Sequence, residues 1–108
     1  MNSDIITHGD LYIGANATIQ GDIKVHGVLV AGRGVRIVGN VVSRQNILFE
    51  GPATVTGNLF AERDIALGPA TVVGETGGYK SVYAARHVML GPNVQVFGWV
   101  FGAGGGRT

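Results

Sequence analysis

The chain has 108 residues, enough for one domain, and its 45% hydrophobic and 14% charged content argues against intrinsic disorder. A net charge of +1 gives no basic excess of the kind that dominates nucleic-acid binding, so we expect no nucleic-acid partner. The chain contains no cysteine, no apolar run of ~20 residues and no signal peptide, so we expect a cytoplasmic protein.

An internal repeat organises the sequence. The heptapeptide GPATVTG at residues 51–57 returns as GPATVVG at residues 68–74, an offset of 17 residues. Looser copies occupy residues 14–21, 32–39 and 91–98. Glycine followed by Asp or Asn recurs every 18 residues at Gly21, Gly39 and Gly57. A fixed period of this length indicates structural units that stack on one another.

Three short segments in each repeat alternate apolar and polar residues, the pattern of a half-buried strand. The apolar positions align in columns, of which the clearest are Ile5, Ile23, Val41, Leu59, Val82 and Val100; Leu11, Leu29, Ile47, Ile65 and Val88; and, with Ala70 beside the last column, Ile19, Ile37, Val55, Val72 and Val96. The columns run in the same direction in every repeat, which excludes hairpins. We therefore predict an all-β, helix-free fold, a single-stranded parallel β-helix (β-solenoid) of triangular section and about five coils.

Domain boundaries and two irregularities follow from the same alignment. The predicted β-helix domain spans residues 4–102, with a short tail at 1–3 and a flexible, Gly-rich tail at 103–108. At Glu50 the two copies of the heptapeptide differ in spacing by one residue. At residues 75–81 six extra residues are expected to form a loop, which is either a tolerated insertion or a partner-binding loop with Tyr79 and Lys80 at its centre.

The outward positions differ between the three predicted faces. The third segment presents an ordinary polar surface with Thr18, Arg36, Thr54, Thr71 and Gln95. The first two segments present apolar side chains, and those we expect to make lateral or membrane contacts are Tyr12, Val42, Leu48, Phe60, Tyr83 and Met89. Contiguous exposed apolar patches usually mark contact surfaces, although the β propensity of these residue types is an alternative explanation.

The ends of a solenoid leave unpaired strand edges and an open core, which other solenoids cover with a cap. We expect neither the residues before Asp4 nor the Gly-rich tail to fold into a cap. An uncapped end gains stability by stacking on another copy of the chain, so self-association is predicted. The expected polymerisation interface consists of Ile5, Ile6, Trp99, Val100 and Phe101.

The sequence gives no signal for catalytic, cofactor-binding or metal-binding residues. The segment Gly32-Arg33-Gly34 precedes no helix, so it does not fit a phosphate-binding loop, and we expect no nucleotide. His8 and His26 share an outward column that continues with Arg44 and Glu62, which leaves too few ligands for a metal. Intervening residues separate Asp10 from Asp64 in another column, so the two do not form an acid–base pair. We expect a protein that is not an enzyme and needs no cofactor.

The repeated phrase carried by Gly21-Asp22-Ile23, Gly39-Asn40-Val41 and Gly57-Asn58-Leu59 resembles the bactofilins over residues 4–102. The resemblance implies a right-handed β-helix and a bacterial cytoskeletal polymer that grows end to end without nucleotide. It also implies contact with the inner membrane and with cell-wall or appendage proteins.

Two alternatives remain open at this stage. One is a subunit like the left-handed hexapeptide-repeat acyltransferases, although glycine here follows the buried aliphatic residue by two positions, as in Ile19-Gln20-Gly21, rather than directly. The other is a binding module of a surface or phage fibre. Filaments without nucleotide would favour the cytoskeletal polymer, and discrete trimers the acyltransferase.

Overall fold

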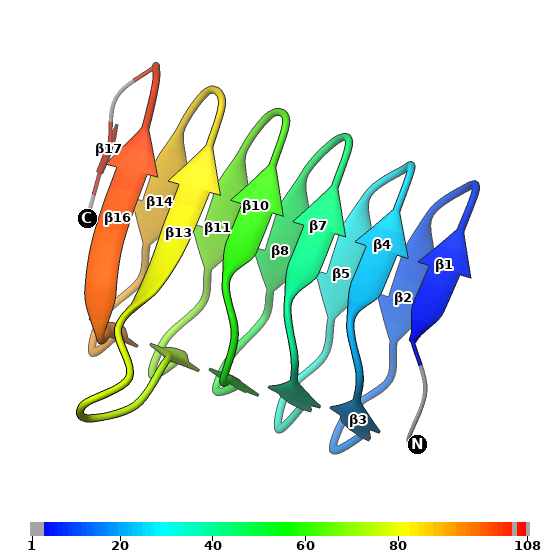
Figure 1. The fold of residues 1–108 in the computed structure, drawn as a ribbon, viewed down its shortest axis with the longest axis horizontal. Coiled ribbons are helices and arrows are strands. Elements are labelled where there is room, and N and C mark those ends of the chain that lie inside the picture. Colours follow the sequence, from blue (N-terminus) through cyan, green and yellow to red (C-terminus); the bar gives the residue numbers. More distant parts are fainter. Residues whose placement is uncertain (1–3, 105, 108) are drawn as a thin grey trace.

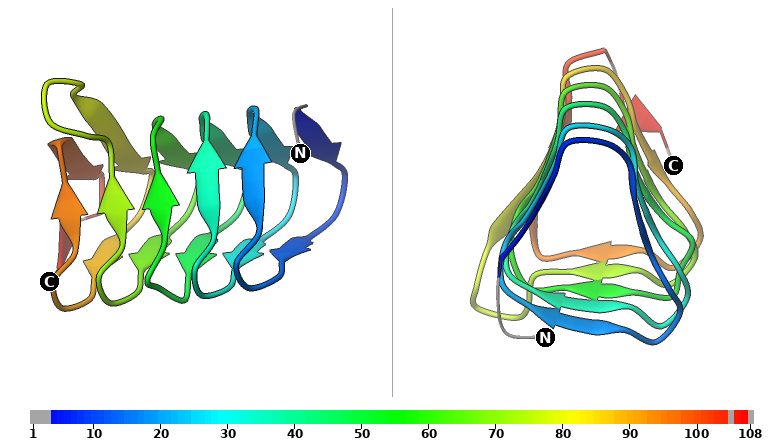
Figure 2. Two further views of the ribbon diagram at one scale, coloured as in Figure 1. Left: turned by 90° about the horizontal axis from the view of Figure 1, so that it is seen from below. Right: turned by 90° about the vertical axis from the view of Figure 1, so that its right-hand side faces the viewer.

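The computed structural model describes residues 4–104 and 106–107, and within them every named element is a β-strand (Figure 1). The strands stack in successive coils along the longest dimension of the molecule, which measures 31 Å. Viewed along the stack, the coils have a triangular outline (Figure 2). The predicted all-β solenoid of about five coils is therefore confirmed, whereas its handedness stays a prediction.

Each side of the triangle is a parallel sheet to which every coil contributes one strand. The first sheet contains β1 (Ile5–Thr7), β4 (Ile23–Val25), β7 (Val41–Ser43), β10 (Leu59–Ala61), β13 (Lys80–Ala84) and β16 (Gly98–Gly102). The second contains β2 (Leu11–Ile13), β5 (Leu29–Ala31), β8 (Ile47–Phe49), β11 (Ile65–Leu67), β14 (Val88–Leu90) and β17 (Gly106–Arg107). The third contains β3 (Thr18–Gln20), β6 (Arg36–Val38), β9 (Thr54–Val55), β12 (Val72–Val73) and β15 (Gln95–Val96).

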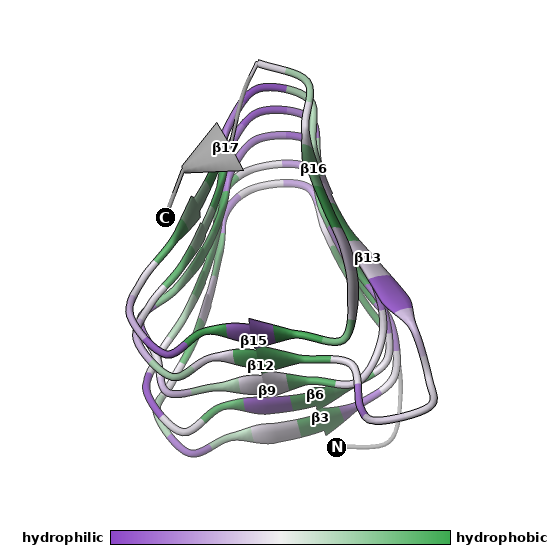
Figure 3. Ribbon diagram, turned by 90° about the vertical axis from the view of Figure 1, so that its left-hand side faces the viewer, coloured by the Kyte–Doolittle hydropathy of each residue, from purple (hydrophilic) through white to green (hydrophobic). Residues whose placement is uncertain are grey.

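The core is the interior of the triangle. Middle coils bury their inward side chains completely, as Ile23, Val41 and Leu59 show with at most 1% of their surface exposed. Figure 3 looks into the stack from the C-terminal end, where the first and second sheets converge on turns that are mainly hydrophilic and the third sheet forms the base. Inward and outward residues alternate along each strand, because successive side chains of a strand point to opposite faces.

The corners hold the coils together through side-chain ladders. At the corner before the first sheet, Asp22 N–H donates to Asp4 Oδ1, Asn40 N–H to Asp22 Oδ1 and Asn58 N–H to Asn40 Oδ1, each at 2.8 Å. Glycine precedes these residues for a steric reason: a Cβ on Gly39 would collide with the carbonyl oxygen of Gly21. The recurring Gly-Asx step is thus the corner motif of the solenoid.

The structure corrects the predicted register of the fourth coil. Val73 pairs with Val55 and Val72 with Thr54, so the coils stay 18 residues apart although the heptapeptides lie 17 apart. Thr71 and Val73 consequently point inward and are fully buried, whereas Ala70 is exposed and Val72 half-buried. The predicted inward positions Ala70 and Val72, and the outward position of Thr71, are wrong. Coil length is maintained because Gly68 N–H already bonds the Phe49 carbonyl at 2.7 Å, which fixes the register before the second heptapeptide begins.

The predicted loop is present, but it is shorter than expected. Leu59 pairs with Val82, 23 positions later, instead of the usual 18, so the loop adds five residues rather than six. Its tip is a tight turn in which Gly78 N–H donates to the Glu75 carbonyl at 2.9 Å. The loop protrudes at the corner between β12 and β13 (Figure 2).

Candidate assembly surfaces

The two end coils expose part of the hydrophobic core. Val82 is fully buried in the fifth strand of the first sheet, whereas Val100 in the same column is 40% exposed. The same change occurs in the other columns, where the partly buried members lie in the end coils: Ile5, Leu11 and Ala17 at one end, and Leu90, Val94 and Val96 at the other. Within the described residues, β1, β2 and β3 each form the edge of their sheet. Both ends therefore present apolar side chains next to strand edges.

The residues expected to form the polymerisation interface divide into two groups. Ile5 and Val100 belong to the core column and face the interior of the end coils. Ile6, Trp99 and Phe101 are exposed and alternate with them, so they lie on the outer face of the first sheet. The structure thus brings Ile5 and Val100 to the stacking ends, and it places the other three beside those ends.

Aromatic rings form a ladder on the outer face of the first sheet. Phe60 on β10 and Tyr83 on β13 stack with ring centroids 5.1 Å apart, and Tyr83 and Phe101 on β16 stack at 5.4 Å. The planes are nearly parallel, at 9° and 5°. Such stacking stabilises cross-strand neighbours by about 0.5–1.5 kcal/mol beyond their burial. The column of outward apolar residues predicted for this sheet is therefore a continuous stack over its last three strands.

The loop contributes a ring that the column pattern does not reveal. Tyr79 lies at the loop's return to β13, and its ring centroid is 6.0 Å from that of Trp99. The contact arises because β13 begins early, at Lys80, which pairs with Gly98 and places Tyr79 beside the end strand. Lys80, the other residue predicted for this loop, is half-buried and its N–H bonds the Phe97 carbonyl at 2.8 Å. Tyr79 is thus the exposed member of the predicted pair.

The remaining predicted contact residues lie on two separate surfaces. Tyr12, Leu48 and Met89 are exposed on the outer face of the second sheet. Val42 is half-buried on the first sheet, between Lys24 and Phe60. The structure does not bring all six residues into one patch.

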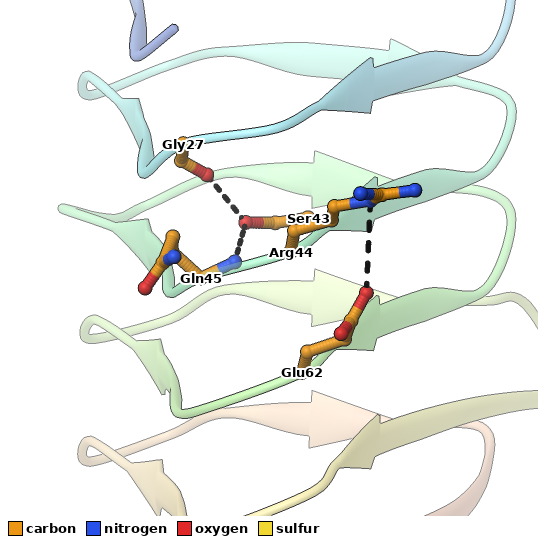
Figure 4. A network of polar contacts seen from close by, with 5 residues as sticks. All are labelled: Gly27, Ser43, Arg44, Gln45 and Glu62. Atoms are coloured by element: carbon orange, nitrogen blue, oxygen red, sulfur yellow. Dashed lines mark hydrogen bonds and ion pairs between the residues drawn. The ribbon is translucent and has the colours of Figure 1, made fainter. Parts of the chain in front are cut away.

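Charged and polar side chains occupy the N-terminal half of the first sheet's outer face (Figure 4). Arg44 Nε lies 4.0 Å from Glu62 Oε2, and both side chains are more than half exposed, so this ion pair contributes little to stability. The rings of His8 and His26 meet edge to face, with centroids 5.0 Å apart. The buried Ser43 hydroxyl donates to the Gly27 carbonyl at 2.7 Å and accepts from Gln45 N–H at 2.9 Å. It links two coils where Val28 has no side-chain acceptor.

Reactive constellations were sought among the described residues. No group of three or more His, Asp or Glu side chains in this part of the chain could hold a metal ion. Asp64 accepts from the backbone N–H of His87 at 3.0 Å and lies 3.4 Å from His87 Nδ1, which makes it a rung of a corner ladder. The described residues also contain no helix long and apolar enough to cross a membrane.

The fold and its surfaces define a class of protein, a one-domain β-solenoid with partly exposed core at both ends of the stack. The family described as Bactofilin, polymer-forming cytoskeletal, matches residues 1–76. The match covers more than half of the 108 residues, so the chain belongs to the bactofilin family, and the resemblance carried by the Gly-Asx steps is confirmed. No curated protein and no solved structure matches the chain.

Proposed function

We propose that this bactofilin is a structural scaffold whose copies stack end to end into filaments. The observation that carries the proposal is the exposure of the core columns in the end coils, of which Val100, 40% exposed beside fully buried Val82, is the clearest case. A second copy would cover these side chains and pair the free strand edges in the same step. Burial of apolar surface supplies the driving force, about 25 cal/mol per Å², and the backbone ladder supplies the register.

Filament growth in this proposal needs no nucleotide and no other cofactor. Stacking removes surface that is already apolar, so no chemical step has to prepare the ends. The proposed setting is the bacterial cytoplasm, at the inner face of the membrane, with cell-wall or appendage proteins as further partners and without nucleic acid. The family membership supports this setting.

The test compares two valine substitutions that differ in position. Val100→Asp places a carboxylate in the end coil, and Val38→Asp places the same carboxylate on a middle coil where valine is similarly exposed, at 36% against 40%. A buried unpaired charge costs several kcal/mol, and each 1.4 kcal/mol lowers affinity about tenfold. We expect Val100→Asp to raise the critical concentration for filaments at least about a hundredfold, by light scattering and negative-stain microscopy.

Val38→Asp should polymerise like the wild type, since its neighbours in the outward column are the polar residues Gln20 and Thr56. Both variants should retain the β-sheet signal in circular dichroism. Filaments of Val100→Asp at the wild-type concentration, or a wild-type protein that never forms filaments, would refute end-to-end stacking.

A further inference from the structure

The outer face of the first sheet is divided into a charged half and an aromatic half. The charged half carries Asp22, Lys24, His26, Arg44 and Glu62. From β13 onward the outward positions are uncharged: Ser81, Tyr83 and Ala85 in one coil, and Trp99, Phe101 and Ala103 in the next. Together with Phe60 and Tyr79 these residues form what we call the aromatic patch.

The aromatic patch is large for an exposed surface. Tyr79 is 68% exposed, Trp99 66%, Phe101 57% and Phe60 39%. Because a fully buried aromatic side chain covers about 150–250 Å², these four rings leave on the order of 450 Å² open to water. Patches of this size on a single chain are usually functional. Most of the patch also lies beyond residue 76, where the match to the bactofilin family ends, so it is an addition to the matched part of the chain.

We propose that the aromatic patch binds the same patch of a second copy and thereby joins two filaments side by side. This inference rests on the proposed stacking, because each filament repeats the patch many times. Two patches together would bury on the order of 900 Å², just below the ~1,000 Å² expected of a specific interface. A single pair is therefore weak, and repetition along the filament provides the strength through multivalency.

The distribution of charge favours a second copy over a lipid surface. In a two-fold contact each aromatic half covers its own equivalent, and both charged halves remain in water. Binding to anionic lipid would require lysine or arginine around the patch. The loop beside it carries one of each sign, Glu75 and Lys80, while Lys24 and Arg44 lie on the other half with Asp22 and Glu62.

The experiment compares Tyr79→Ser with Tyr12→Ser. Both replace a tyrosine of similar exposure, 68% and 63%, but Tyr12 lies on the outer face of the second sheet. We expect wild-type and Tyr12→Ser filaments to form bundles in electron micrographs, and Tyr79→Ser filaments to remain single. The concentration at which bundles appear should rise about tenfold or more for Tyr79→Ser. Trp99 is the only tryptophan, so acrylamide quenching of its fluorescence should fall several-fold in bundles.

Three outcomes would overturn the inference. Wild-type filaments that stay single at every concentration exclude the contact, and so does bundling that is lost in Tyr12→Ser but kept in Tyr79→Ser. Protection of Trp99 by anionic phospholipid vesicles, without any protection in bundles, assigns the patch to a membrane. If filaments fail to form at all, sedimentation decides separately: a weak dimer that Tyr79→Ser abolishes supports the patch contact, and a strictly monomeric wild type refutes it.

Discussion

Thr71 shows at the scale of one residue how a repeat can mislead. Its hydroxyl is fully buried, and Thr71 Oγ1 has no hydrogen-bond partner. The equivalent inward positions in the neighbouring coils are the apolar residues Ala53 and Val94. The 17-residue match of letters predicted an outward threonine, whereas backbone pairing keeps the 18-residue coil and turns it inward. The sequence pattern could not decide between the two registers, because small and β-branched residues fill either one.

Thr71→Val should stabilise the protein by about 1 kcal/mol, since a buried hydroxyl without a partner costs about 1–3 kcal/mol and valine has nearly the same shape. The measurement is urea unfolding in a Val100→Asp background, because assembly would otherwise add to the apparent stability. Thr54→Val, an outward and half-buried control, should change the free energy of unfolding by less than about 0.5 kcal/mol. If Thr71→Val has no effect, the inward placement of Thr71 is wrong.

At the scale of elements, sequence periodicity predicted the strands and corners but not the contacts of the loop. Columns that repeat every coil identify which residues of β4, β7 and β10 face the core, because the pleat of a strand imposes a period of two. Tyr79 belongs to no column, since the inserted residues interrupt the period just before it. Its position against Trp99 depends on the early start of β13, which is set by pairing with β16. The predicted contact residues were therefore found one by one, and the aromatic patch was not.

The corner ladder offers a test at this scale. Asp22 Oδ1 accepts the Asn40 N–H at 2.8 Å and the Asn40 side-chain amide at 3.3 Å. Asp22→Ala removes both bonds and should cost about 1 kcal/mol in urea unfolding, again in the Val100→Asp background. Asp22→Asn keeps an acceptor, as Asn40 does for Asn58 in the next coil, and should restore most of the loss. Equal losses in the two variants would show that the side-chain oxygen is not what links the coils.

For the whole molecule, the expected assembly reaction depends on apolar surface and strand edges rather than on charge. The net charge is +1, and the end-coil residues that stacking would cover are Ile5, Leu11 and Ala17 on one side and Leu90, Val94 and Val100 on the other. Salt screens charge interactions between exposed groups but leaves apolar burial largely intact. A filament built this way should tolerate high ionic strength.

The critical concentration for filaments should accordingly stay unchanged in the presence of ATP or GTP with magnesium, and it should not rise between low and high salt. Lys24, His26 and Arg44 line a shallow hollow on the outer face of the first sheet, so phosphate groups have a place to bind. That hollow lies on middle coils, however, and its occupation would leave the strand edges of β1 and β16 untouched. Light scattering at a series of protein concentrations measures the threshold under each condition. A threshold that moves with nucleotide would show that a bound phosphate alters the ends, and a threshold that rises with salt would show that charge pairs hold the contact.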